Sequence, residues 1–356
     1  MADFPRQARH YYQDPLACIW EQCAERVGFR VQRSREAYAS CDGRGTLLIA
    51  MDDQLDPDDN LGQMILHELC HALIEGETGE RTPDWGLDNT RMGNPWREQA
   101  CLRLQAWLAG GVGLRDFFAP TTDFRVTFWE SLPADPFASE RGRRERGCVA
   151  ARVGAWRAGQ PRWAGPLRSA LEASARLAAC VPRRGTSRTR DALPPLWDTA
   201  HPPPPMHPAG HAPVAPYHAG RSCADCAWVH VPRHRRRCRH TPRVALPPDA
   251  PACFRYEPAG ELDCRTCGAC CREAYDSVEI SPREPVNGIR PEWIVVEATH
   301  RKLKRNGERC VALMGGHQPD EAYACAIHPD RPRTCREFTR GSENCLDARR
   351  KVGLSL

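Results

Sequence analysis

The sequence predicts an α+β protein in which one helix-and-strand domain is followed by small, irregular modules that bind metal through cysteine. Three observations predict this class. The first 135 residues contain apolar runs of both strand and helix length. One helical run contains the sequence His-Glu-x-x-His, beginning at His67. Of the 19 cysteines, 12 lie between Cys223 and Cys345 in closely spaced groups, which in a reducing compartment indicates metal ligands rather than disulfides.

The overall composition says little about the partners of the protein. The 50 basic residues outnumber the 45 acidic residues, but only three of the basic residues are lysines, so the arginine excess reflects a general compositional bias. The chain contains no apolar run with the character of a secretory signal and no stretch long enough to cross a bilayer. We therefore expect a cytoplasmic protein that does not contact membranes.

The first expected elements are a helix and two strands. Asp14-Pro15 begins a helix that extends to about Val27, because Asp is a favourable cap and Pro is favoured in the first turn. Residues 29–34 have the alternating pattern of a strand. A turn at residues 42–45, which contains two glycines, leads into the short buried strand Thr46–Ala50.

The helix around His67 is the centre of this first domain. It is expected over residues 60–75, with capping groups at residues 56–59 and with Gly76 and Gly79 marking its end. Nearly all of its other side chains near the motif are apolar, so the helix should be buried.

The two histidines of this helix are four residues apart and therefore point in the same direction. The imidazoles of His67 and His71 can share one zinc ion, and Glu68 projects beside them, where a carboxylate can activate water as a general base. The alternative is a histidine pair that only fills the core. The apolar helix and its start signal favour the metal site.

A third zinc ligand must come from outside this helix, and Glu98 is the main candidate. A helix is expected over residues 96–109, after an Asn-Pro start signal. Glu98 shares the inward face of this helix with Cys101, Leu104 and Leu108. A carboxylate at the head of a buried face needs a partner, which zinc would provide; alternatively, it interacts only with the helix dipole. Asp84 and Asp88, in the preceding loop, are the other candidates.

The order of helix, strands and His-Glu-x-x-His helix resembles the zincins, over residues 1–135. The resemblance is to zinc peptidases whose third ligand is an acidic residue on the following helix, including the small bacterial repressor-cleaving enzymes. It implies a zincin-like domain that hydrolyses peptides, with zinc held by His67, His71 and Glu98 and with Glu68 as the catalytic base.

The next two segments are expected to connect domains. Residues 136–195 are rich in Arg and Ala, have helical patterns near 149–157 and 167–179, and are interpreted as a helical connector. Residues 196–221 form a Pro- and His-rich linker of extended character. We expect its histidines to be solvated rather than to bind metal; they are His201, His207, His211 and His218.

A four-cysteine module follows over residues 222–258. A Cys-x-x-Cys pair and two later thiols fit a closed tetrahedral zinc site formed by Cys223, Cys226, Cys238 and Cys253. The module holds seven Arg and three acidic residues, and five of the Arg lie in the basic run 233–239. A basic loop can contact nucleic acid phosphates, but a solvated loop is the simpler interpretation.

The last module, residues 259–356, contains eight cysteines. Four of them lie within eight residues around Gly268, which permits the turn that directs thiolates at one ion. The candidate ligands are Cys264, Cys267, Cys270, Cys271, Cys310, Cys325, Cys335 and Cys345. They could hold two zinc ions, or one iron–sulfur cluster beside structural thiols, because thiolates suit both. A helix is expected over residues 291–305, ending at Asn306-Gly307.

This cysteine spacing, together with the run from Cys325 through His328 and Pro332 to Cys335, resembles the YkgJ-type cysteine-cluster family. The resemblance covers residues 262–350 and implies chelation of zinc or iron. His328 departs from the family pattern, which usually has Tyr at this position, and it adds a nitrogen to the candidate ligands.

Together these features predict a metal-binding protein with zinc, and with zinc or an iron–sulfur cluster in its last module. The leading hypothesis for activity is a zinc metallopeptidase in the first domain, acting on a protein or peptide. A second hypothesis is a metal-chelating or iron–sulfur redox-sensing protein whose zincin scaffold is inactive. A third is a nucleic-acid-binding zinc module, which has few aromatic side chains to stack on bases.

Overall fold

The computed structural model describes residues 10–87, 95–140, 144–183, 193–203, 207–211, 220–318 and 321–356. The chain forms two compact units. Unit 1 consists of Met1–Ser131 and Arg157–Pro203, and unit 2 consists of Leu132–Trp156 and Pro204–Leu356. The chain therefore passes between the units three times. Helices and short sheets are both present, so the expected α+β class is confirmed.

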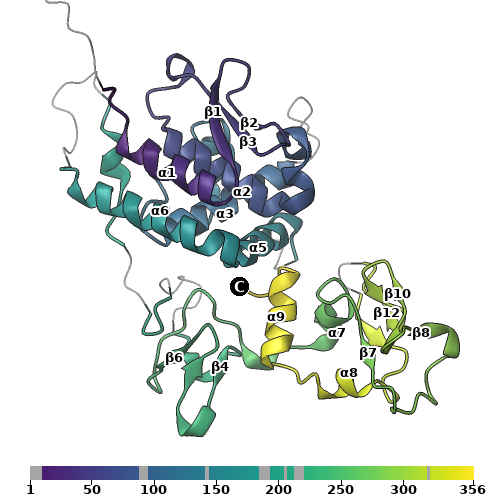
Figure 1. The fold of residues 1–356 in the computed structure, drawn as a ribbon. Coiled ribbons are helices and arrows are strands. Elements are labelled where there is room, and N and C mark those ends of the chain that lie inside the picture. Colours follow the sequence, from purple (N-terminus) through teal and green to yellow (C-terminus); the bar gives the residue numbers. More distant parts are fainter. Residues whose placement is uncertain are drawn as a thin grey trace, which may run out of the picture. The chain divides into compact units, whose positions relative to one another are not determined.

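Unit 1 contains a small sheet and most of the long helices (Figure 1). Its elements are α1 (Pro15–Arg26), β1 (Arg30–Ser34), β2 (Ala39–Cys41), β3 (Thr46–Ala50), α2 (Leu61–Glu80), α3 (Pro95–Gly110), α4 (Phe124–Thr127) and α6 (Pro161–Cys180). The boundary between the units lies within α5 (Arg146–Ala158).

The sheet of unit 1 has the order β1-β3-β2. β1 runs parallel to β3, and β2 runs antiparallel to β3 with Ala39 opposite Ile49. β3 is central and buried, as its apolar sequence predicts, whereas β2 is an edge strand that the sequence analysis did not identify. β2 and β3 both contact α2, so the sheet edge lies close to the helix that carries the histidines.

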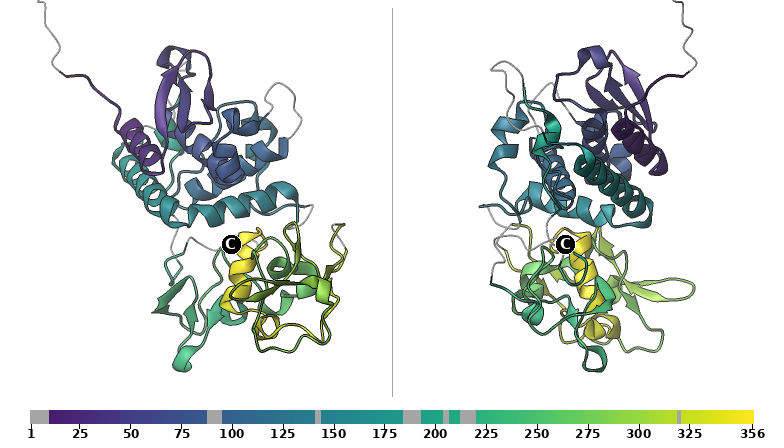
Figure 2. Two further views of the ribbon diagram at one scale, coloured as in Figure 1. Left: turned by 45° about the vertical axis from the view of Figure 1, so that its right-hand side comes forward. Right: turned by 90° about the vertical axis from the view of Figure 1, so that its left-hand side faces the viewer.

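Helix α2 is buried between its neighbours. It packs against α1 and α3, and the ribbon views show it among the other helices of unit 1 (Figure 2). Its residues Ile65, Leu66, Leu69 and Leu73 are completely inaccessible to solvent. Asn60 caps its start by accepting a hydrogen bond from the backbone N–H of Gln63 at 2.8 Å. This agrees with the expectation of an apolar helix that begins near residue 60.

The regular part of α2 ends at Gly76, which has a left-handed φ of 67° inside the helix span. The Arg157 guanidinium lies at this break and donates to the carbonyls of Leu73 and Ile74, at 2.6 and 2.7 Å. A β-carbon at Gly76 would lie 2.9 Å from the guanidinium carbon. Glycine is therefore needed both for the backbone angle and for the approach of the arginine that satisfies the free carbonyls.

Helix α6 packs on α1 in unit 1, although the sequence analysis assigned it to a connector. The indole Nε1 of Trp20 donates to the hydroxyl of Ser174 at 3.0 Å, and both residues are completely buried. The core of unit 1 is thus assembled from two separate stretches of the chain.

Unit 2 is built mainly from very short strands. It contains β4 (Val229–His230), β5 (Arg237–Cys238), β6 (Thr241–Ala245), β7 (Glu279–Ile280), β8 (Ile294–Val296), β9 (Arg301–Leu303), β10 (Arg305–Asn306), β11 (Arg309–Cys310), β12 (Leu313–Met314) and β13 (Ala324–Cys325). Its short helices include α7 (Cys264–Cys267), α8 (Arg333–Glu337) and α9 (Glu343–Lys351). The sheets have the orders β4-β5-β6 and β7-β9-β8, with two further hairpins.

The expectation of a helix over residues 291–305 is wrong. A short 3-10 turn is followed by β8, which pairs with β9, and Gly307-Glu308 joins β10 to β11. Three consecutive β-branched residues, from Ile294 to Val296, favour the strand, and Gly307 adopts the positive φ of 59° that a tight hairpin turn requires.

The four-cysteine and eight-cysteine segments share one core in unit 2. Arg349, from α9, donates through Nε to Glu257 at 2.9 Å, and Ser355 also donates to this carboxylate. Leu346 of α9 belongs to the same buried cluster as Trp228. These contacts join the C-terminal helix to the region around the four cysteines. Among the described residues, no helix is long and apolar enough to span a membrane.

Candidate metal centres

The structure brings His67, His71 and Glu98 together in unit 1. The two Nε2 atoms are 3.2 Å apart, and Glu98 places one carboxylate oxygen 3.3 Å from Nε2 of His67 and the other 3.1 Å from Nε2 of His71. Two ligand atoms at about 2.0–2.1 Å from a tetrahedral zinc ion lie about 3.3 Å from each other. The three side chains therefore already have the mutual spacing of zinc ligands.

The electrostatics of this group also fit a cation. Burial lowers the pKa of His67, but the Glu98 carboxylate raises it more, and the net pKa rises to about 10. Burial raises the pKa of Glu98, but the charges of the two histidines hold it well below the usual range. The arrangement favours a positive charge between the carboxylate and the imidazoles, which a divalent cation would supply.

Gln105, on α3, fixes the orientation of His67. Its amide nitrogen donates to the Phe118 carbonyl at 2.6 Å, so its amide oxygen is the atom that lies 2.9 Å from Nδ1 of His67. Nδ1 must then carry a proton, so that in the neutral ring, the form that binds metal, the lone pair is on Nε2 and faces the site. The sequence analysis did not select Gln105, because its role depends on how α3 packs on α2.

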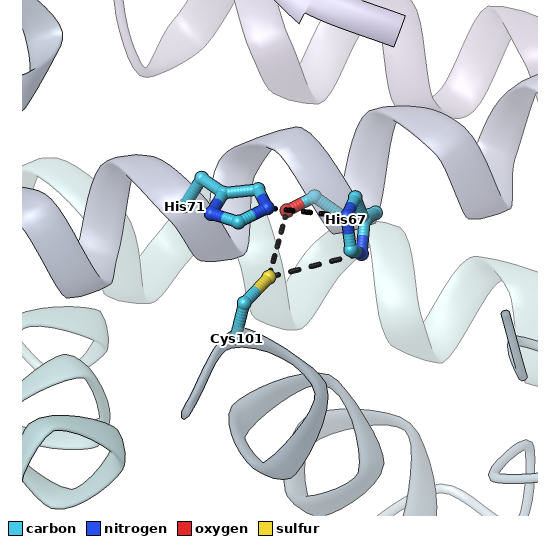
Figure 3. A group of neighbouring side chains, drawn as sticks. All are labelled: His67, His71 and Cys101. Atoms are coloured by element: carbon cyan, nitrogen blue, oxygen red, sulfur yellow. Dashed lines mark hydrogen bonds between the residues drawn. The ribbon is translucent and has the colours of Figure 1, made fainter. Parts of the chain in front are cut away.

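Cys101 is a third neighbour of the histidine pair (Figure 3). Its sulfur lies 3.7 Å from Nδ1 of His67 and 3.4 Å from the His67 carbonyl. Three potential ligand atoms, one each from His67, His71 and Cys101, all lie within 4.8 Å of one another. However, burial and the neighbouring Cys70 raise the pKa of Cys101 well above its usual value, which favours a neutral thiol that donates to the carbonyl.

Glu68 is held by the indole of Trp85. Nε1 of Trp85 donates to the Glu68 carboxylate at 2.7 Å, and both side chains are buried. Together with the two histidines and Glu98, they line a cavity of about 230 Å³ that also reaches Tyr38 beside the edge strand β2. The candidate base therefore lies in the same cavity as the candidate ligands.

The turn that carries Trp85 is strained. Asp84 and Trp85 both have left-handed φ angles, 52° and 56°. Such angles are unfavourable for residues other than glycine and often occur at functional sites. Asp84 lines the same cavity, and burial raises its pKa, although a hydrogen bond from Ser40 and the charge of His71 oppose this rise. Asp88 lies outside the described residues.

The eight cysteines of the last segment fall into two groups in the structure. Cys271, Cys310, Cys325 and Cys335 share one apolar cluster, whereas Cys267 and Cys270 belong to another. After burial, the largest influence on the raised pKa of Cys264 is Cys345, followed by Cys267. The sulfurs of the adjacent residues Cys270 and Cys271 are 3.9 Å apart and mark where the two groups meet.

Two further features of this segment agree with the proposal that its closely spaced cysteines bind metal. Gly268 ends α7 with a left-handed φ of 61°, which supplies the turn between the second and third cysteines. The backbone N–H groups of Ala312 and Ile327 lower the pKa values of Cys310 and Cys325, although burial raises both more strongly. His328, the extra nitrogen candidate, is exposed.

The remaining candidates lie in the first part of unit 2. Cys223, Cys226, Cys238 and Cys253 are all buried and unpaired by disulfides. In the basic run, Arg233 and Arg235 are exposed at the end of a loop. Two histidines of the expected linker, His207 and His211, are only 5% and 7% exposed, so the expectation that they are solvated is wrong. His218 lies outside the described residues.

Comparison with known proteins identifies the last segment. Residues 263–351, which contain all eight cysteines of that segment, match a family model described as "CxxCxxCC: Putative zinc- or iron-chelating domain". The chain is also 35% identical to the "Uncharacterized protein YkgJ" of Escherichia coli O157:H7 over 107 residues, which covers 26% of this chain and 93% of that protein. No solved structure matches the chain. By this similarity over nearly the whole length of a relative, the chain belongs, through its C-terminal segment, to the CxxCxxCC cysteine-cluster family.

Proposed function

We propose that this protein is a zinc-dependent peptidase joined to a metal-chelating cysteine domain. The observation that carries the peptidase proposal is the spacing of 3.1–3.3 Å among the donor atoms of His67, His71 and Glu98. Two imidazoles and one carboxylate are the ligand set of zinc hydrolases and leave a fourth position for substrate. The sheet, the histidine helix and the ligand helix together support a zincin-like fold for unit 1.

The side chains around this ligand set have distinct tasks. A zinc ion held there would act as a Lewis acid toward a peptide carbonyl. Glu68 would take a proton from the attacking water, and Trp85 would hold the Glu68 carboxylate in place through its 2.7 Å hydrogen bond. Gln105 would keep His67 in the tautomer that exposes Nε2.

The edge strand β2 provides a place for an extended substrate. Among the described residues it pairs only with β3, and its first residue, Ala39, lines the cavity that contains Glu68, together with the preceding Tyr38. A peptide that adds to a free sheet edge gains backbone hydrogen bonds without requiring a particular sequence. We therefore propose a peptide or an extended protein segment as the substrate.

The test compares three variants for zinc content and for hydrolysis of a broad peptide library. Glu68→Gln should keep zinc in unit 1 but lose activity by about 10²- to 10⁴-fold, because only the base is removed. His67→Ala should lose the zinc itself. Glu77→Gln, at an exposed position of the same helix, should match the wild type. Wild-type protein that hydrolyses no peptide, or a fully active Glu68→Gln variant, would disprove the peptidase assignment.

The second part of the proposal concerns the eight cysteines. Their division into two packed groups favours two separate four-thiolate sites, one formed by Cys264, Cys267, Cys270 and Cys345 and the other by Cys271, Cys310, Cys325 and Cys335. Metal analysis and a visible spectrum of anaerobically purified protein test it. Bound zinc without visible absorption supports two zinc sites, whereas absorption that disappears on oxidation supports an iron–sulfur cluster and the redox-sensing alternative.

A further inference from the structure

We propose that the four-cysteine cluster of Cys223, Cys226, Cys238 and Cys253 is a separate zinc centre, and that the turn from His207 to His211 forms its outer shell by donating N–H···S hydrogen bonds. This centre lies outside the segment that matches the CxxCxxCC family. In this proposal residues 207–211, which have the composition of a linker, are part of a metal site.

The fold brings the four thiols together from separate strands and turns. Cys238 lies in β5 opposite Val229 of β4, and Cys226 forms an antiparallel bridge with Pro258. Ser222 bridges Pro251 in the same way, which places Cys223 beside the turn that leads to Cys253. Three of the four thiols pack in one buried cluster, and Cys253 is 5% exposed.

The four thiols lie in one buried region and form no disulfides. A Cys-x-x-Cys pair together with two later thiols is the ligand set of a closed zinc site.

The backbone supports three of these sulfurs in the same manner. The backbone N–H groups of Trp228, His240 and Arg255 each donate a hydrogen bond to the sulfur of the cysteine two residues earlier, namely Cys226, Cys238 and Cys253. A backbone donor two residues after a cysteine stabilises negative charge on its sulfur. The N–H of Gly43 donates to Cys41 in unit 1 in the same way, at 3.4 Å, so the contact indicates a metal site only where it recurs at several buried thiols.

The fourth sulfur, Cys223, has a side chain as its donor. Nε2 of His207 lies 3.3 Å from this sulfur. The other ring nitrogen, Nδ1, accepts a hydrogen bond from the backbone N–H of Ala209 at 3.0 Å. Because Nδ1 is an acceptor, Nε2 carries the proton of the neutral ring and has no lone pair for a metal. His207 is therefore a donor to Cys223 rather than a ligand.

His211 occupies the equivalent position at Cys238. Its Nε2 lies 3.4 Å from that sulfur, and its ring is nearly parallel to the ring of His207. The backbone N–H of His207 donates to the His211 carbonyl at 3.0 Å, which closes the turn. Both imidazoles are thus fixed over the cluster by one short turn. Outer-shell donors of this kind strengthen metal binding by about 10- to 100-fold.

The first experiment needs no variant. The full-length protein, loaded with Zn²⁺, is treated with a thiol-alkylating reagent before and after a strong chelator, and the modified cysteines are identified by mass spectrometry. The four cysteines should be protected with zinc and should react together once it is removed. Exposed Cys18 and Cys180 are the internal controls and should react in both states. Equal reactivity of the four thiols with and without zinc would overturn the proposal.

The second experiment tests the role of the histidines. Cys226→Ser should reduce the zinc content of the full-length protein by one ion. His207→Ala should keep the full zinc content but release this ion about 10- to 100-fold more readily to a competing chelator, and His207→Gln, which restores an N–H donor, should recover part of the loss. His234→Ala, at an exposed position of the same segment, should have no effect.

The same variants distinguish an outer-shell histidine from a ligand. Co²⁺ replaces zinc in the wild type and in the Cys226→Ser variant, and the visible spectrum of the variant is subtracted from that of the wild type. This difference spectrum should have the bands of a four-sulfur site. His207→Ala should leave the positions of these bands unchanged. A shift of the bands in His207→Ala would make His207 a ligand and would overturn the outer-shell assignment. An unchanged release rate in His207→Ala would overturn it as well.

Discussion

The histidine site of unit 1 and the cysteine clusters of unit 2 hold their donor atoms in different ways. The histidines and Glu98 project from two long helices whose packing is fixed by completely buried side chains such as Leu66 and Leu104. The cysteines lie on turns and on strands of two or three residues, for example β5 and β13. Unit 1 thus has a scaffold independent of its site, whereas much of unit 2 is arranged around its thiols.

The two units therefore differ in whether a bound metal ion would be needed for folding. In unit 1 the core positions the proposed ligands, so a zinc ion would add chemistry to a structure that is already formed. In unit 2 the strands are too short to be stable alone, and buried ionisable thiols lie among the few apolar side chains. A metal ion there would contribute folding free energy directly. The predictions below test this contrast.

Removal of metal should have the largest effect, and it should affect the two units unequally. Treatment of the full-length protein with a strong chelator should abolish the cooperative structure of unit 2 while most of the helix signal of unit 1 remains, because α1, α2, α3 and α6 form an apolar core. Hydrogen exchange resolved by peptide measures each unit separately. Equal loss of protection in both units would contradict the contrast.

Removal of one ligand should abolish binding at one site only. Glu98→Gln keeps the shape of the side chain but removes the charge between the two imidazoles, and zinc affinity in unit 1 should fall by more than the ~100-fold typical of outer-shell changes. Cys101→Ala, in contrast, should leave zinc affinity nearly unchanged. The reverse result would make Cys101 the third ligand. Competition with a zinc-binding dye measures both.

A smaller change in affinity should follow from releasing the orientation of His67. Gln105→Leu removes the amide oxygen that lies 2.9 Å from Nδ1 and should reduce zinc affinity by about 10- to 100-fold without loss of the fold. The buried Phe118 carbonyl also loses its donor, so thermal unfolding of the metal-free protein serves as the control for stability. An unchanged zinc affinity would show that α2 alone orients the ring.

The smallest effect should come from the partner of the base. Trp85→Phe keeps an aromatic ring beside Phe29 but removes the N–H that holds Glu68. The loss of a buried hydrogen bond to a carboxylate should cost about 1–3 kcal/mol of stability, and peptidase activity should fall by roughly tenfold with zinc retained. Loss of zinc in this variant would instead place Trp85 in support of the metal site. Chemical denaturation and zinc analysis provide the two readouts.

Residue spacing predicted the features that depend on one element alone. The four-residue separation of His67 and His71 determined their common direction, and the proline at the start of α1 marked a helix start seen in the structure. The start of α2 was also predicted near residue 60, but its cap is Asn60 rather than the expected residues 56–59. Glu98 was selected because a carboxylate on a buried helix face needs a partner, and the structure places it 3.1 Å from His71.

Features that depend on contacts between elements were not predicted. Gln105 and Trp85 gain their roles only through the packing of α3 and of a strained turn against α2. The Pro-rich composition around His207 indicated a solvated linker, but composition cannot show that the turn contacts Cys223 and Cys238 elsewhere in the sequence. The strand β8 was missed because the spacing of Trp293, Val296 and His300 also fits a helix face.

The divided chain of unit 1 has a consequence for the timing of synthesis. All three proposed zinc ligands have been synthesised once the ribosome passes Glu98, but Arg157 and Ser174, which complete α2 and the site of Trp20, follow up to 76 residues later. At about 5–20 residues per second this interval lasts roughly 4–15 s. A nascent chain therefore carries the proposed ligands before it carries the fold that holds them, and the proposed zinc site should form only late in translation.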